Sequence, residues 1–190
     1  MRSRTLAGLL TAVALVLLTA CTSTPETPAA PAAAVDAAHE PADVAFAQGM
    51  IPHHRQAVAM SRLAESRAAS PQVKDLAARI EGEQGPEIEQ MTAMLTAWGA
   101  PVPAGDEQPM AMAGMPGMMG PQQMADLGAL SGPAFDRAFL TMMIAHHTGA
   151  VQMAQAELAQ GTNPQARELA QAIIGAQQAE IAEMQRLLQA

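Results

Sequence analysis

The chain has 190 residues and a formal net charge of −8 at pH 7, from 18 acidic and 10 basic side chains. This balance argues against a nucleic acid partner, because phosphate backbones are bound by clusters of Lys and Arg. With no Tyr, three Phe and one Trp, the core must be built from Ala, Leu, Ile, Val and Met. Such a core favours helices over a β-sheet, which is usually rich in β-branched and aromatic residues.

The first twenty residues have the pattern of a secretory signal peptide. Two arginines precede an apolar run at 6–20 that is too short to span a bilayer. The run ends in the sequence LTAC, which resembles a bacterial lipobox, where the cysteine becomes the lipidated first residue of the mature protein. Cys21 has no partner for a disulfide, so we expect a lipid anchor on the outer face of a membrane, with a free thiol as the alternative.

Composition divides the rest of the chain into a tether and one domain. Residues 21–42 are rich in Pro and Ala and show no apolar periodicity, so we expect a disordered tether in which His39 has no role. Residues 43–190 have the length of one ordinary domain.

An internal duplication organises this domain. An offset of 93 aligns residues 43–97 with 136–190 without a gap, and 22 of the 55 positions are identical. Each copy predicts two helices joined at a proline. The predicted parts are repeat one at 43–98, a connection at 99–132 and repeat two at 133–190.

Capping residues define the predicted helix ends. Asp43 is expected to be the N-cap of the first helix, and Ser70 and Asn163 are expected to cap helices that begin with proline. Gly99 should end the second helix. Pro52 is expected to kink the first helix or delay its start, because it cannot donate a helical hydrogen bond.

Neither hairpin can hide its apolar stripe alone, so the two should pair as an all-α four-helix bundle. The connection between them is longer than ordinary loops and predicts a short helix at 122–130. It also contains five closely spaced methionines. These methionines are Met110, Met112, Met115, Met118 and Met119. They indicate either a low-complexity linker or a segment that binds Cu(I) transiently.

A pair of adjacent histidines occurs at the same place in each copy. Helical projection puts both imidazoles beside the inward stripe, together with methionines three residues before and six or seven residues after them. Imidazole binds Cu, Zn, Ni and Fe, whereas thioether sulfur favours Cu(I). The candidate metal ligands are His53, His54, His146, His147, Met50, Met143, Met60 and Met153. Whether the two pairs share one site is open at this stage.

These motifs differ from those of di-iron bundles, which place Glu three residues before His. Here methionine stands at that position, and only Glu87 and Glu180 remain as plausible inward carboxylates. Both could hold an imidazole by its other nitrogen. Other residues on the same faces are Gln84, Gln177, Met91 and Met184. The alternatives are methionines that only fill the core and histidines that are structural.

Two motifs carry a family resemblance. The pattern F-x3-M-I-x-H-H-x2-A-x2-M begins at Phe46 and Phe139, and Q-x2-E-I-x2-M begins at Gln84 and Gln177. Both resemble the family catalogued as domain of unknown function 305. The resemblance covers nearly everything after the tether. It implies a ferritin-like helical bundle and copper as the ligand, since the best-understood relatives are periplasmic copper-binding proteins of the CopM type that support copper resistance.

The sequence therefore predicts an exported, lipid-anchored protein that buffers or transfers Cu(I), with copper ions and a copper-transfer protein as partners. No catalysis is expected, because no nucleophile or organic-cofactor motif accompanies the ligands. One alternative is a ferritin-like metal oxidase. The other is an interaction module without metal, whose histidines are structural or pH-sensing.

Overall fold

The computed structural model describes residues 34–105 and 114–189, and in these ranges it contains helices and no strand. The predicted all-α class is confirmed. None of the described helices is long and apolar enough to cross a membrane. The helices are α1 (Pro41–Arg67), α2 (Pro71–Ala97), α3 (Pro121–Ala129), α4 (Gly132–Gln160) and α5 (Pro164–Gln189).

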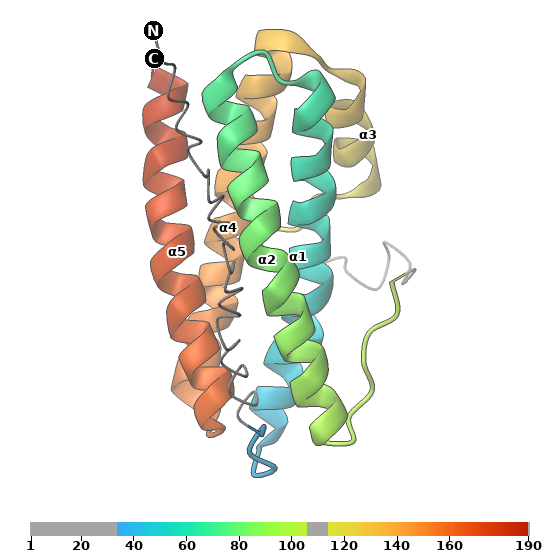
Figure 1. Cartoon of the computed structure of the whole chain (residues 1–190), viewed down its shortest axis with the longest axis vertical. Helices are drawn as coiled ribbons and strands as arrows, with labels where there is room; N and C mark the ends of the chain where they lie inside the picture. Colours follow the sequence, from blue (N-terminus) through green and yellow to red (C-terminus); the bar gives the residue numbers. More distant parts are fainter. Residues whose placement is uncertain (1–33, 106–113, 190) are drawn as a thin grey trace, which may run out of the picture. The chain divides into compact units, whose positions relative to one another are not determined.

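Four long helices form a bundle of two hairpins, and the short helix α3 lies outside it (Figure 1). Helices α1 and α2 form one hairpin, α4 and α5 form the other, and α1 packs against α4. Residues near the start of α1 contact residues near the end of α4, so these two helices run in opposite directions. Helix α3 matches the short helix expected in the connection.

Three of the predicted caps are present. The Ser70 hydroxyl accepts a hydrogen bond from Val73 N at 3.4 Å, and the Asn163 side chain accepts one from Ala166 N at 3.0 Å. Helix α2 ends at Ala97, and Gly99 follows with a φ of 67°. These bonds satisfy backbone N–H groups that the first turn of a helix leaves without partners.

The prediction that Asp43 caps α1 is wrong. Helix α1 begins two residues earlier, and Asp43 lies in its first turn, where its carboxylate accepts a 2.6 Å hydrogen bond from Glu40 N. The same carboxylate also reaches the second hairpin. It accepts hydrogen bonds from Thr162 N and Asn163 N in the turn between α4 and α5.

Pro52 does not delay the start of α1, which is one of the two effects expected from the sequence. The helix runs continuously from Pro41 to Arg67 through Pro52, which is buried. A proline removes one helical hydrogen bond. Here eleven residues of helix precede Pro52, and the packing of the buried helix face compensates for the missing hydrogen bond.

The end of the predicted tether also differs from expectation. Residues 34–40 pack against the bundle, and the ring of His39 stacks on Trp98 with 5.0 Å between ring centroids. Trp98 Nε1 donates a hydrogen bond to Asp36 O at 3.0 Å. These contacts with α2 were not evident from composition, because a Pro/Ala-rich segment carries no pattern that identifies its partner.

A polar layer divides the core into two apolar clusters. Along each long helix, one apolar cluster ends before this layer and the other begins after it. Phe46 and Met50 belong to the first cluster, and Met60 and Phe139 belong to the second. We call the set between them the polar layer; its members are His53, His54, Gln84, Glu87, His146, His147, Gln177 and Glu180.

Candidate metal centre

The two histidine pairs meet in the centre of the bundle. All four imidazoles are fully buried. The rings of His53 and His146 have centroids 3.8 Å apart, with an angle of 44° between their planes. Because α1 and α4 are antiparallel, equivalent residues of the two repeats lie opposite each other at this level. The question left open by the sequence is answered: the pairs belong to one layer.

The second histidine of each pair is held by a carboxylate. His54 Nε2 lies 2.7 Å from Glu87 Oε2, and His147 Nε2 lies 2.8 Å from Glu180 Oε2. A carboxylate oxygen accepts, so Nε2 carries the proton in both rings and donates it. The lone pair of each ring is then on Nδ1, the nitrogen that can bind a metal.

The connection supplies the partner of His53. Residues 114–120, which we call the strap, lie against α1 and α4 beside the polar layer. His53 Nε2 donates a hydrogen bond to the carbonyl oxygen of Pro116 at 3.0 Å, so its Nδ1 also keeps the free lone pair. His146, its counterpart in repeat two, has no hydrogen-bond partner at either ring nitrogen.

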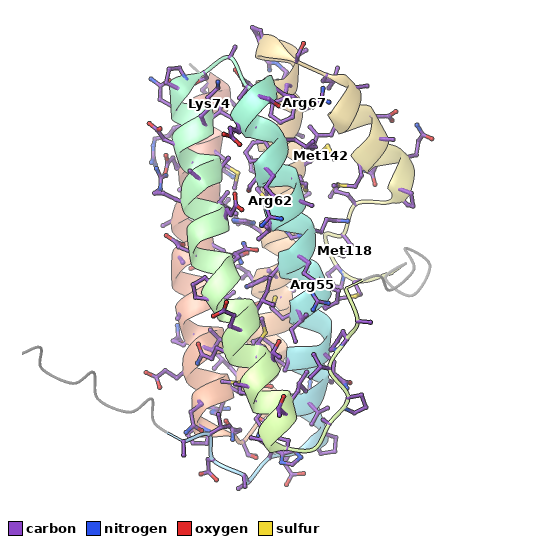
Figure 2. The ribbon with its side chains drawn as sticks, turned by 45° about the vertical axis from the view of Figure 1, so that its right-hand side comes forward. Arg55, Arg62, Arg67, Lys74, Met118 and Met142 are labelled. Atoms are coloured by element: carbon purple, nitrogen blue, oxygen red, sulfur yellow. The ribbon has the colours of Figure 1, made fainter. Side chains whose placement is uncertain are left out.

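The strap is fixed by backbone contacts on both helices. The Gln56 amide donates to Met119 O at 2.8 Å and accepts from Met119 N at 2.7 Å. On α4, a Cβ at Gly149 would overlap the carbonyl group of Pro116. Only glycine allows this close approach. Figure 2 shows Met118 on the side of α1 along which the connection runs, near Arg55.

Burial keeps the two central imidazoles neutral. The pKa of His53 is lowered to about 4, mainly by desolvation and to a smaller extent by charges on His54 and His147, against the opposing effect of the Pro116 carbonyl. Desolvation also lowers the pKa of His146 well below its ordinary value, with the charge on His53 as the next cause. A neutral imidazole is the form that binds metals.

The polar layer contains many buried polar atoms without partners. Buried polar groups in folded proteins nearly always have hydrogen bonds to protein or water, so a concentration of exceptions fits a site that binds a metal or a polar ligand. Within the described ranges, no three His, Cys, Asp or Glu side chains are arranged as a ready metal cluster. The unpartnered atoms include Nδ1 of His53, His54 and His147, both ring nitrogens of His146, both amide atoms of Gln84, Gln177 Oε1 and Glu180 Oε1.

The predicted methionine ligands occupy different places. Met50 and Met143 are fully buried one helical turn before the histidines. Met60 lies in the second apolar cluster with Phe139, and Met153 packs against the first, which contains Phe46. Met91 and Met184 are fully buried in the core. Cys21, Met110 and Met112 lie outside the described residues, whereas Met115, Met118 and Met119 belong to the strap.

Comparison with known proteins identifies the family. The family described as "Domain of unknown function (DUF305)" matches residues 43–188. The chain belongs to the DUF305 family. No curated protein matches the sequence.

Solved structures of DUF305 proteins have the same fold. A DUF305 fragment from Deinococcus radiodurans is 36% identical, with 78% of this chain and 96% of that chain covered and a TM-score of 0.70. A DUF305 protein from Streptomyces coelicolor is 35% identical, with coverage of 77% and 91% and a TM-score of 0.70. CopM in its Cu(I)-bound form is 32% identical, with coverage of 77% and 95% and a TM-score of 0.65.

Sequence reasoning missed the part of the layer that comes from the connection. From the sequence, the connection is expected to contribute only methionines and a short helix. The contact with His53 comes from the backbone carbonyl of Pro116. The two hydrogen bonds that hold the strap on α1 come from the side chain of Gln56. One signal was available, since Gln56 and Gly149 occupy equivalent positions in two repeats that otherwise match around the histidines.

Proposed function

We propose that this DUF305 protein binds copper in the polar layer, with Cu(I) as the preferred form, and buffers it or hands it to a copper-transfer protein. One observation carries the proposal. Three imidazoles have Nε2 bound to an oxygen acceptor, and the fourth has no partner, so four buried rings offer free nitrogen lone pairs at one level. The similarity to CopM, whose structures contain Cu(I) or Cu(II), supports copper as the metal.

The buried sulfurs favour Cu(I) within this proposal. Met50 and Met143 lie one turn from His53 and His146, and thioether sulfur is a soft donor that selects Cu(I). Met60 and Met153 stand about two turns beyond the histidines, roughly 10 Å along the helix at 1.5 Å per residue. We therefore assign the direct sulfur contacts in the polar layer to Met50 and Met143, and place Met60 and Met153 outside the layer as further sulfur donors for copper.

The carboxylates favour binding over oxidase chemistry. A di-iron or related oxidase site needs carboxylates that bridge two metals. Glu87 and Glu180 instead each hydrogen-bond to an imidazole of their own hairpin. Their role in the proposal is to orient His54 and His147 and to increase the basicity of the coordinating nitrogen.

A Cu(I) titration against a competing chelator tests the proposal. We expect a His53→Ala/His146→Ala variant to bind Cu(I) at least about tenfold more weakly than the wild type. His39→Ala is the matched control, because His39 stacks on Trp98 away from the layer. Equal affinity in the double variant and the wild type would contradict the proposal.

A second variant separates binding from folding. His146 has no hydrogen-bond partner at either ring nitrogen, so His146→Leu removes two unpaired polar atoms from the core. We expect the metal-free variant to unfold at a temperature no lower than the wild type, while its Cu(I) affinity falls. A variant that stays folded and binds Cu(I) normally would exclude His146 as a ligand.

We also propose that the protein is exported and anchored by lipid on Cys21, outside the cytoplasm. The support is the lipobox-like sequence at 18–21 behind a signal-like segment. Cys21→Ala should move the protein from the membrane fraction to the soluble fraction of the expressing bacterium. Retention of the variant in the membrane fraction would contradict lipid anchoring at this residue.

A further inference from the structure

Two methionines meet over Gly49, outside the polar layer. A Cβ built on Gly49 would lie 3.0 Å from the methyl carbon of Met153 and 3.7 Å from that of Met115. The ends of both side chains therefore reach the place that a side chain at residue 49 would occupy. Met115 comes from the strap and Met153 from α4, so three separate segments form this place.

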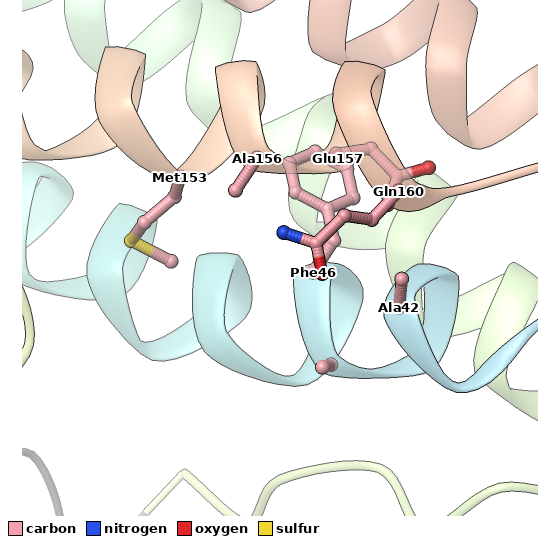
Figure 3. Close-up of a pocket in the computed structure, with 7 residues that line it drawn as sticks. Ala42, Phe46, Met153, Ala156, Glu157 and Gln160 are labelled. Carbon is pink, nitrogen blue, oxygen red and sulfur yellow. The ribbon is translucent and has the colours of Figure 1, made fainter.

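This methionine pair differs from the buried methionines of the core. Met115 and Met153 are both half-buried, whereas Met50 and Met143 are fully buried. The close-up in Figure 3 shows Met153 pointing from α4 toward α1 at one end of a groove between the two helices. Solvent therefore reaches these sulfurs more readily than the histidine nitrogens.

The pair also lies close to the histidines along the chain. Gly49 is four residues before His53, which is about one helical turn. Met115 precedes Pro116, whose carbonyl group accepts the hydrogen bond from His53. One peptide unit and one helical turn thus link the methionine pair to the polar layer.

We propose that Met115 and Met153 form a separate capture site for Cu(I), which binds the ion through two thioether sulfurs before it passes to the polar layer. The inference rests on the proposed function, because it names the route by which that layer is filled. Two soft sulfurs at a partly exposed place suit a monovalent soft ion. The transfer is an exchange of ligands, so the ion keeps its oxidation state and no electron acceptor is needed.

The test uses Ag(I), a soft monovalent ion that does not change oxidation state under these conditions. The chain is labelled with [methyl-13C]methionine and titrated with Ag(I) while its methyl NMR signals are followed. Met115→Leu and Met153→Leu assign the two signals and remove one sulfur each. We expect both signals to shift together in the wild type, and the Met153 signal of Met115→Leu to need about tenfold more Ag(I).

Met118→Leu is the matched control, because Met118 is a half-buried methionine of the same strap. It should leave the Met153 response unchanged. The proposal is overturned if Met153 responds to Ag(I) equally in wild type and Met115→Leu, or if Met118→Leu weakens the response as much. Histidine 15N signals from the same titration report on the polar layer independently, so loss of that response alone would contradict the proposed function and leave the methionine site standing.

Discussion

At the scale of single residues, the carboxylate partners decide which ring nitrogen of His54 and of His147 is free. Glu180 accepts the Nε2 proton of His147, which leaves Nδ1 with its lone pair inside the bundle. Glu87 does the same for His54 in the first repeat. Without this acceptor, the imidazole can switch between its two neutral tautomers and rotate, and both changes weaken metal binding.

Substitution of Glu180 should therefore weaken copper binding in a graded way. Glu180→Gln keeps an oxygen acceptor of the same shape, whereas Glu180→Ala removes it. We expect Cu(I) affinity to fall in the order wild type, Gln, Ala, with a loss of about 10- to 100-fold for alanine. Competition titration with a chelator measures all three proteins.

Glu183→Ala controls for the loss of charge on α5. Glu183 pairs with Arg79 at the partly exposed surface, 2.6 Å away, and does not contact a histidine. Its removal should leave the affinity unchanged. If Glu183→Ala and Glu180→Ala have equal effects, the contribution of Glu180 is one of general charge and the role assigned to its hydrogen bond is wrong.

Side-chain patterns predicted this part of the layer, but they could not predict its backbone contacts. The repeated Met-x-x-His-His motif, and a glutamate more than four turns into the helix that follows it in each repeat, are patterns that the sequence displays. The carbonyl of Pro116 belongs to no such pattern, because every residue has a carbonyl group and only the path of the chain determines which one reaches His53. The strap also has no counterpart in the duplication.

At the scale of elements, the strap makes two equivalent histidines unequal. His53 and His146 occupy the same position in the two repeats, yet only His53 has an oxygen acceptor. A single segment that crosses between two related helices cannot present the same carbonyl to both. The unpartnered ring of His146 is therefore a consequence of the connection, and the histidine motif itself does not explain it.

Gly149→Ala should displace the strap. The added Cβ would overlap the Pro116 carbonyl, and backbone atoms cannot move aside as a flexible side chain can. We expect a loss of about 1–3 kcal/mol in the free energy of unfolding, in the range for an overpacked site. Urea denaturation measures the stability, and the 15N signal of His53 reports the loss of its hydrogen bond.

Gly175→Ala is the matched control for helix propensity. Gly175 lies within α5, and a Cβ there would meet no atom within 4 Å. Alanine favours the helix, so this variant should gain roughly 0.5–1 kcal/mol. If Gly149→Ala were stabilised by the same amount, the strap would not be held at Gly149.

The duplication predicted the long helices well because it supplied two readings of one pattern. Shared prolines marked the turns, and the repeated apolar spacing marked the buried faces. The start of α1 at Pro41 was missed because the alignment of the repeats begins at Asp43. The packing of residues 34–40 was missed because its key contacts use backbone oxygens, as in the bond from Trp98 to Asp36.

At the scale of the molecule, the two hairpins hold each other through equivalent aspartates. Asp43 accepts hydrogen bonds from the turn between α4 and α5, and Asp136 accepts hydrogen bonds from Ala69 N and Ser70 N in the turn between α1 and α2. Each aspartate therefore ties its own repeat to the other. This mutual arrangement explains why the residue is retained in both copies although it is the N-cap residue of neither helix.

One end of the bundle departs from this symmetry. The residue beside Asp43 is Glu157, whereas the equivalent position in repeat one is Ala64. A compensating change accompanies it. A Cβ at Gly161 would overlap the carboxyl group of Glu157, and the equivalent of Gly161 in repeat one is Ala68. Figure 3 shows Glu157 in the groove between α1 and α4.

Glu157 is protonated over most of the neutral range. Its pKa is raised from the ordinary 4.5 to about 8, mainly by burial and then by the neighbouring Asp43 carboxyl, against the opposing charge of Arg167. Burial also opposes ionisation of Asp43, but hydrogen bonds from Glu40 N and other backbone groups outweigh it and lower the pKa of Asp43. The negative charge of this pair is therefore held by Asp43.

The stability of the fold should consequently depend on pH through Glu157. A carboxyl whose pKa is higher in the folded state stabilises the fold fully below pH 4.5, and this contribution is lost as the pH rises to about 8. Glu157→Gln imitates the neutral acid at every pH. Its melting temperature should be close to that of the wild type at pH 5 and higher by about 4 °C or more at pH 9, since roughly 1 kcal/mol corresponds to 2–4 °C for this chain length.

The difference between variant and wild type isolates this effect from the histidines. The lowered pKa of His53 makes the fold more stable as the pH rises from about 4 to its ordinary value of 6.5, the opposite direction. That contribution is the same in both proteins and cancels in the difference.

Glu89→Gln, at an exposed position of α2, should show no such trend. If the difference in melting temperature between Glu157→Gln and the wild type is the same at every pH from 5 to 9, Glu157 does not hold the proton. The carboxyl pair with Asp43 is then not the source of any pH dependence.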